Sequence, residues 1–254
     1  MGSGTYSVLQ KSLDQRVDRE VVEEISVILP SVTRYDSYRI SRGQFGILVS
    51  GLAQQEAMAF HRQLQARAID TEVVADADLP VLHKSFPIRG VKPAGDRIGL
   101  ADTIGREMTR PLKELVFLAA GYVSRLRASS KPTGAVSRDG LERSGGMGGG
   151  STIIEHEYSL GRVREFRLDL FFWSKPHRMH ISVREETLAF FHDQPIRLKN
   201  RAGLTGLMLA MADLLPEKRL NQVLRDPLNA GDYPDISDYE EEICWHFHRI
   251  GKGI

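Results

Sequence analysis

Hydrophobic periodicity orders the chain up to Ala75 as strand, helix, strand, strand, helix and strand, and this order constrains the fold more than any other feature of the sequence. Apolar residues recur at helical spacing in two stretches, and short β-prone runs precede, separate and follow them. The predicted elements are a strand at Tyr6–Leu9, a helix over 17–29, strands at Asp36–Ser41 and Phe45–Ser50, a helix over 53–64 and a strand at Thr71–Ala75.

A split β-α-β pattern of this kind predicts a four-stranded antiparallel sheet with two helices on one face, which is the ferredoxin-like βαββαβ arrangement. We therefore expect an N-terminal α+β domain over residues 5–80. The same arrangement supports many unrelated activities, so it constrains the function very little.

A second, β-rich domain is predicted over residues 96–254, after a connector at 81–95 that contains Pro87 and Pro93 and has no helical period. Alternating residues predict a hairpin around Lys175-Pro176, and Asn200 is a good N-cap for an apolar helix that ends before Pro216. Further short strands are predicted at 97–101, 106–110 and 115–126. Several antiparallel strands followed by a closing helix resemble the pleckstrin-homology-like class, which implies a small barrel or sandwich closed by C-terminal helices.

Residues 128–151 are rich in Gly, Ser and Pro, and their composition predicts a flexible loop inside the second domain. Basic residues exceed acidic ones in and beside this segment, which gives an anion-binding hypothesis for lipid or nucleic acid. The residues concerned are Arg125, Arg127, Lys131, Arg138 and Arg143. The alternative is that these charges keep a loop solvated, and the lack of interleaved aromatic residues favours it.

The overall charge balance gives no global attraction to nucleic acid or membrane, because 34 Lys and Arg residues face 33 Asp and Glu residues. The longest apolar run, at 115–123, is too short to cross a bilayer. A single cysteine, Cys244, fits a reducing compartment. We expect a soluble, cytoplasmic protein with no membrane-spanning segment and no cofactor.

The C-terminal histidines give a metal-site hypothesis that the spacing only partly supports. Ser237 to Glu240 match a capping box, and the helix that follows carries an apolar stripe at Tyr239, Ile243, Phe247 and Ile250. On that helix Glu242 and His246 can meet, whereas His246 and His248 cannot share an ion. The full set of candidate ligands is His156, Glu242, His246 and His248. An ordinary surface Glu–His pair is the favoured interpretation of Glu242 and His246.

Catalytic motifs are missing from the sequence, and Cys244 between apolar neighbours is typical of a small packed side chain. We therefore predict a non-enzymatic binding or scaffold protein in which a sheet surface meets a protein or peptide, with self-association left open. The alternatives are a metal-dependent hydrolase that uses the C-terminal His and Glu residues, and a peripheral module that binds anionic lipid or nucleic acid through residues 125–143. Convergent polar side chains between the two domains would favour an enzyme.

Overall fold

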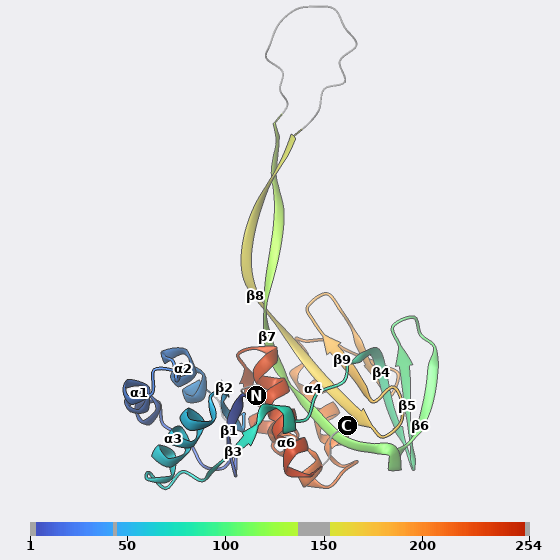
Figure 1. Cartoon of the computed structure of the whole chain (residues 1–254). Coiled ribbons are helices and arrows are strands. Elements are labelled where there is room, and N and C mark those ends of the chain that lie inside the picture. The colour runs from blue at the N-terminus through green and yellow to red at the C-terminus, as the bar shows by residue number, and fades with distance from the viewer. Residues whose placement is uncertain (1–3, 43–44, 137–152, 252–254) are drawn as a thin grey trace, which may run out of the picture.

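Two open sheets and six α-helices make up the described part of the chain (Figure 1). The computed structural model describes residues 4–42, 45–136 and 153–251, and only the backbone at 34, 41–42, 126–136 and 153–160. The mixed α and β content expected from the sequence is confirmed. Within the described residues, no helix is long and apolar enough to cross a membrane.

The first sheet has three strands, with β1 (Tyr6–Gln10) between β2 (Ile47–Leu52) and β3 (Thr71–Ala75) and antiparallel to both. Helices α1 (Arg19–Ile28) and α3 (Gln54–Gln65) bury the apolar positions that the periodicity indicated, including Val22, Ile25, Phe60 and Leu64. The predictions of these two helices and of the strands at Tyr6 and Thr71 are confirmed.

Helix α2 (Arg34–Arg42) occupies the segment for which a strand at Asp36–Ser41 was predicted, so that prediction is wrong. The cause is a reciprocal cap, in which the backbone N–H of Thr33 donates to Asp36 Oδ2 (2.8 Å) and the backbone N–H of Asp36 donates to Thr33 Oγ1 (3.2 Å). This pairing satisfies free donors at the helix start. Three strands result where four were expected, and the ferredoxin-like arrangement is not confirmed.

The second sheet has nine strands, in the order β11-β10-β4-β9-β8-β7-β12, with β5 and β6 extending it beside β4. Its strands are β4 (Phe86–Ala94), β5 (Arg97–Asp102), β6 (Glu107–Pro111), β7 (Leu115–Val136), β8 (Ile153–Phe172), β9 (Arg178–Val183), β10 (Ala189–Phe191), β11 (Gln194–Ile196) and β12 (Asp232–Tyr233). The predicted hairpin at Lys175-Pro176 is confirmed as β8 and β9. Strand β4 lies entirely within residues 81–95, the segment predicted as a connector. Among the described strands the sheet does not close, so the barrel is not confirmed.

Three helices contribute side chains to the core of the second sheet, two of them before β12 in the chain and one after it. Helix α4 (Arg201–Ala212) starts at the predicted cap, because Asn200 Oδ1 accepts from the backbone N–H of Gly203 at 2.9 Å. Helix α5 (Gln222–Arg225) is short. Helix α6 (Ile236–Arg249) is capped by Asp235 and not by Ser237, so it begins earlier than the predicted capping box. The described chain also contains four 3₁₀ turns between its helices and strands, at Asp76–Asp78, Leu112–Glu114, Glu217–Arg219 and Pro227–Asn229.

Helix α6 lies between the two sheets and contacts both (Figure 1). Phe247 packs against Phe117 and Phe171 of the second sheet, with ring centroids 5.0 Å apart in each case. Trp245 packs against Leu9 and Ile47 of the first sheet. The predicted apolar stripe of this helix is therefore confirmed, and its opposite side holds the first sheet.

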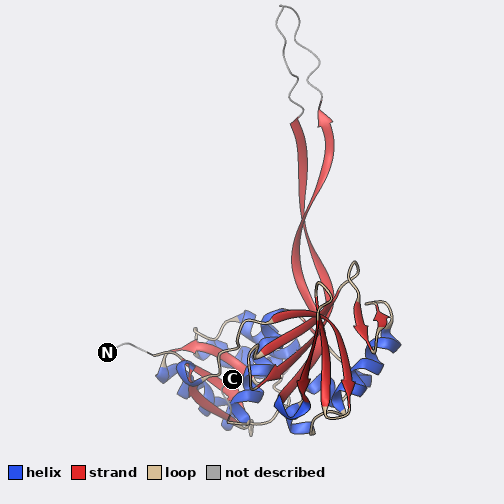
Figure 2. Ribbon diagram, turned by 90° about the vertical axis from the view of Figure 1, so that its right-hand side faces the viewer, coloured by secondary structure: helices blue, strands red, loops and turns tan. Residues whose placement is uncertain are grey.

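Strands β7 and β8 continue beyond the sheet as a long twisted ribbon (Figure 2). We call the part formed by residues 124–136 and 153–165 the arm. Its pairing runs to Val136↔Ile153, which carries β7 past Ala128, where the predicted flexible loop begins. Positions 137–151 of that loop lie outside the described residues.

Candidate functional site

The arm has two edges that no other described strand covers. Strand β9 pairs with β8 only from Phe166 to Phe171, and β12 pairs with β7 only at Tyr122 and Val123. Beyond these points no described strand pairs with the outer side of either arm strand. The backbone donors and acceptors along both edges are therefore available to another chain, which is the property that lets a strand edge recruit a partner.

Before the arm begins, the same edge of β7 is covered by other parts of the protein. Asn221 Oδ1 accepts from the backbone N–H of Ala120 (3.0 Å), and Asn221 Nδ2 donates to the carbonyl of the same residue (2.8 Å). The backbone N–H of Asn221 donates to the carbonyl of Leu118 at 3.1 Å. Asn221 thus covers this edge through its side chain and its backbone N–H, the short strand β12 covers the next two residues, and the coverage ends where the arm begins.

Ionic contacts fix the base of the arm to the body. The buried carboxylate of Glu165 accepts from Arg184 Nε (2.6 Å) and Ser182 Oγ (3.1 Å), and it lies 3.0 Å from Nε of Arg125. The guanidinium of Arg164 lies 4.1 Å from the ring centre of Tyr122 and also pairs with Asp232. These contacts join β7, β8 and the end of β9, and they hold the direction in which the ribbon leaves the sheet.

The predicted anion-binding residues are spread along the arm rather than gathered. Arg125 is paired with Glu165 at its base. Arg127 and Lys131 belong to β7 farther out, where the backbone alone is described. Arg138 and Arg143 lie outside the described residues. The structure therefore brings none of these five residues together in a described anion site.

The predicted metal ligands are also separated, although two of them meet. Glu242 Oε1 and His246 Nε2 are 3.4 Å apart and both side chains are buried, so the expectation of a surface pair is wrong. His248 lies on another side of the helix, 3.1 Å from Glu72 of β3. His156 belongs to β8 in the arm, and its side chain is not described. Among the described residues, no three His, Cys, Asp or Glu side chains are grouped as metal ligands would be.

A cleft of about 380 Å³ is lined by residues from both ends of the sequence. Arg16 and Phe45 come from the N-terminal part, and Tyr233 and Glu242 come from the C-terminal part. Its innermost polar groups are bonded to each other. The Tyr233 hydroxyl donates to Glu242 Oε2 at 2.5 Å, and the backbone N–H of Gln222 donates to Glu242 Oε1 at 2.8 Å. Burial, and then the Glu242 carboxylate, raise the pKa of Tyr233 well above its usual value, so the phenol remains a donor. This geometry favours a structural role.

A buried ionic cluster that the sequence analysis missed joins β8 and β9 to α6. Asp169 is completely buried and accepts from Arg167 Nε (2.5 Å), Arg178 Nε (2.7 Å) and the Tyr239 hydroxyl (3.0 Å). Arg178 Nη2 also donates to Glu240 at 2.8 Å. The Asp169 carboxylate is bonded only to groups inside the protein, so the cluster stabilises the fold and is not a binding site for a ligand from solution.

Cys244 is expected to react slowly with alkylating reagents. Burial, and then the negative charge of Glu240, raise its pKa to about 11. Because the thiolate is the reactive form, alkylation by iodoacetamide at pH 8 should be about a hundredfold slower than in the unfolded chain. The chain unfolded in guanidinium chloride is the matched control, and equal rates for the two forms would contradict the burial of this thiol.

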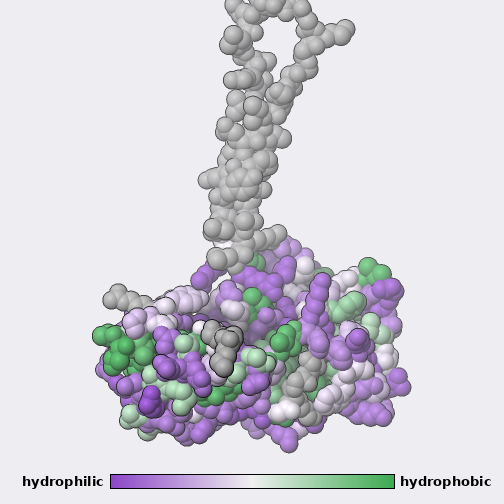
Figure 3. Space-filling view, in the orientation of Figure 1, coloured by the Kyte–Doolittle hydropathy of each residue, from purple (hydrophilic) through white to green (hydrophobic). Residues whose placement is uncertain are grey.

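Apolar side chains are exposed at the end of the molecule formed by α1 and α2. Val27 is 83% and Ile28 is 60% exposed. Figure 3 shows a hydrophobic area at this end, on a face that is otherwise mostly hydrophilic. Exposed apolar area of this kind is often a contact surface for another protein.

Comparisons with known proteins add no functional information. No family model matches the chain, and no match was found among curated proteins or solved structures. The function must therefore be argued from the geometry alone.

Proposed function

We propose that this is a non-enzymatic binding protein in which the arm pairs edge to edge with an extended segment of a partner protein. The observation that carries the proposal is that, among the described strands, none pairs with either outer edge of the arm over residues 124–136 and 153–165. Strand addition to a free edge is a common mode of peptide recognition, in which main-chain hydrogen bonds supply the affinity.

The stability of isolated ribbons supports this proposal. A two-stranded ribbon alone in water is marginally stable, and three or more strands or a packed face are normally needed. The ribbon here continues far beyond its last neighbouring strand, so a partner that supplies another strand would stabilise it. The ribbon itself contributes little to the stability of the fold, which favours a role in binding.

A protein partner fits the charges better than a polyanion does. The formal net charge of the chain is +1, and the acidic residues Glu155 and Glu157 lie on the arm beside its basic residues. Binding to nucleic acid or anionic lipid depends on a concentrated positive surface. The single cysteine agrees with action in a reducing compartment such as the cytoplasm.

Shortening the arm tests the proposal. Arg127 and Gly161 are paired in the ribbon, so an Asn-Gly turn can replace residues 128–160 between them. We expect tagged full-length protein, expressed in its own cells and cross-linked, to enrich a partner that the shortened form recovers about tenfold less, which corresponds to about 1.4 kcal/mol. With the purified pair, hydrogen exchange should slow at the arm amides of residues 124–136.

A charge variant separates this mechanism from its alternative. Arg127→Gln with Lys131→Gln removes two cations and leaves the backbone edges intact, so the partner should still be recovered. The proposal is contradicted if the shortened form recovers the same proteins as the full-length chain, or if exchange slows only on the body. Loss of binding in the charge variant, together with retention of the wild type on DNA or anionic vesicles, would instead favour the anion-binding alternative.

A further inference from the structure

The direction of the backbone groups along β7 follows from its contacts with Asn221. The N–H and the carbonyl of Ala120 both bond to this side chain at the outer edge, and in an antiparallel strand these groups change side from one residue to the next. The β7–β8 register has no shift between Phe117 and Pro132. Every second residue from Ala120 therefore turns its backbone groups outward, up to and including Pro132.

The two edges of the arm differ in what they offer to a further strand. Pro132 has no N–H, so the β7 edge lacks a donor there, and a register shift follows before Gly134. Proline and irregular register both make an edge unsuitable for pairing. The β8 residues opposite the outward ones of β7 also face outward, and none of them is proline. They are His156, Tyr158, Leu160, Arg162 and Arg164.

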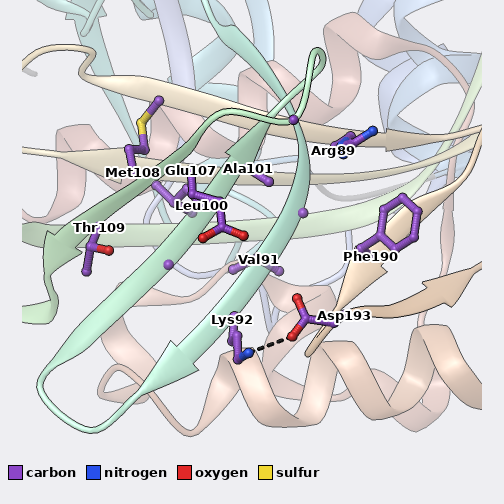
Figure 4. A pocket seen from close by; sticks show the side chains of 13 residues that line it. Arg89, Val91, Lys92, Leu100, Ala101, Glu107, Met108, Thr109, Phe190 and Asp193 are labelled. Carbon is purple, nitrogen blue, oxygen red and sulfur yellow. Dashed lines mark hydrogen bonds and ion pairs between the residues drawn. The ribbon is translucent and has the colours of Figure 1, made fainter.

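A cavity of about 330 Å³ over β4, β5 and β6 is a poorer place for another chain, because its charged groups already interact within the protein (Figure 4). Lys92 Nζ donates to Asp193 at 2.5 Å and is also attracted by Glu107. The Arg89 guanidinium lies 5.5 Å from the ring centre of Phe190. Along the arm, by contrast, the outer main-chain groups have no partner strand among the described residues.

The free part of the β8 edge matches itself in length. Strand β9 leaves β8 at Phe166, so the free stretch of the described strand is 153–165, with Ser159 at its centre. Two copies of this stretch pair over their whole length when they run antiparallel about a two-fold axis at Ser159. In this register outward residues meet outward residues, with Tyr158 opposite the partner's Leu160, as an antiparallel ladder requires.

The apolar residues of the arm also match a second copy. Alternation places Leu126, Ala128, Tyr158 and Leu160 on the sheet face that carries Phe166 in the core. Pairing of two copies joins the two apolar stripes into one, and apolar residues directly opposite each other stabilise a sheet. Four strands with an apolar face form a stable unit, whereas two strands alone are marginal.

The other face brings unlike charges of the two copies into one row. Glu157 is opposite Lys131 in its own chain, and on its other side it meets the partner's Gly161, which is followed by the partner's Arg127. Glycine adds no side chain between them, so the acidic residue has a basic residue in each direction along the row. The formal net charge of +1 per chain adds little repulsion between two copies.

We propose that the partner of the arm is a second copy of this chain, and that the two copies pair antiparallel along β8 about Ser159 into one four-stranded ribbon. This inference rests on the proposed function, because it names the partner for the same strand addition. The same edge serves both copies, and the assembly closes at two because β7 with its Pro132 forms both outer strands.

Sedimentation velocity of the purified full-length chain tests the pairing. We expect the wild type to dimerise and Leu160→Pro to raise the dimer dissociation constant about tenfold or more, because each copy loses an outward N–H. Ala128→Pro is the matched control, since Ala128 lies opposite Leu160 on the β7 edge, and it should dimerise like the wild type. Leu160→Ala removes the side chain and keeps the donor, so it should weaken the dimer less than Leu160→Pro.

Cysteine cross-linking tests the register. Ser159 and its copy form a non-hydrogen-bonded pair, in which the Cα atoms lie about 4.5 Å apart, a distance that a disulfide spans. Ser159→Cys should therefore give a covalent dimer on oxidation. Gly161→Cys is the matched control and should not, because its two copies are offset along the strands.

The inference is overturned if the wild type is a monomer, if Leu160→Pro dimerises as well as Ala128→Pro, or if Ser159→Cys cross-links no better than Gly161→Cys. A monomer whose arm still recovers a different protein overturns the second copy as partner and leaves the proposed function standing. If shortening the arm changes neither the dimer nor the recovery of partners, both are contradicted.

Discussion

Replacing Asp169 with asparagine is expected to lower the free energy of unfolding by about 3–5 kcal/mol, because it leaves two buried guanidinium groups without their shared carboxylate. Arg167 and Arg178 both donate to Asp169 from within the interior, and their side chains are 5% and 4% exposed. Asparagine has the same shape and no charge, so packing is preserved. Urea unfolding followed by circular dichroism measures the loss.

The matched control is Glu185→Gln, which breaks an ion pair between Glu185 and Lys199 that is exposed to solvent. Exposed pairs contribute little, so no measurable change in stability is expected. If both variants lost the same amount, the buried cluster would have no special part in stability.

Acid titration provides a second measurement of the same cluster. Burial alone raises the pKa of Asp169, but the charges of Arg167 and then Arg178 outweigh it and hold that pKa below its usual range. A carboxylate with a lowered folded-state pKa contributes stability above its unfolded pKa of about 3.9, and this is lost as the pH falls through the folded value. The wild type should therefore lose more stability than Asp169→Asn as the pH falls from about 5 to 2.

Replacing Trp245 with alanine is expected to cost about 3–5 kcal/mol and to free the first sheet from α6. The Trp245 ring is so close to the backbone of Gly46 that a Cβ there would lie 2.2 Å from Cγ of the ring. Its Nε1 also donates to the carbonyl of Gln10 at 2.6 Å. Relative to the wild type, hydrogen exchange measured by mass spectrometry should increase more at the amides of β1 and β2 than at those of β8 and β9.

Trp173→Ala is the matched control, because Trp173 and Trp245 are the two tryptophans of the chain. Trp173 is 48% exposed whereas Trp245 is 6% exposed, so its loss should cost about 1 kcal/mol or less. A uniform increase in exchange over both sheets in Trp245→Ala would contradict the inference that this residue holds the first sheet to the helix.

Local patterns in the sequence predicted most individual elements, because they depend on residues close in the chain. The period of Val22 and Ile25, the Asn200 cap and the alternation in β8 all led to elements that the structure confirms. The prediction of a strand at Asp36 was wrong, because the apolar residues there have no clear helical spacing. The helix start is nevertheless encoded locally, by the reciprocal cap between Thr33 and Asp36.

The site could not be predicted in the same way, because it depends on contacts between distant residues. Gly and Ser in 128–151 suggested a loop, yet the cross-strand register at Lys131↔Glu157 belongs to a paired ribbon. The i,i+4 spacing did bring Glu242 to His246, but their burial follows from β7 and α5, which spacing on one helix cannot show.

The position of α6 in chain order has a consequence for biosynthesis. Of the described elements it is the last to leave the ribosome, yet it covers apolar residues of the first sheet, Leu9 and Ile47, which are among the earliest to emerge. Until α6 has been synthesised, these apolar residues lack the Trp245 side chain that buries them in the folded protein. Nascent chains that stall before Trp245 should therefore be targets for chaperones or proteases.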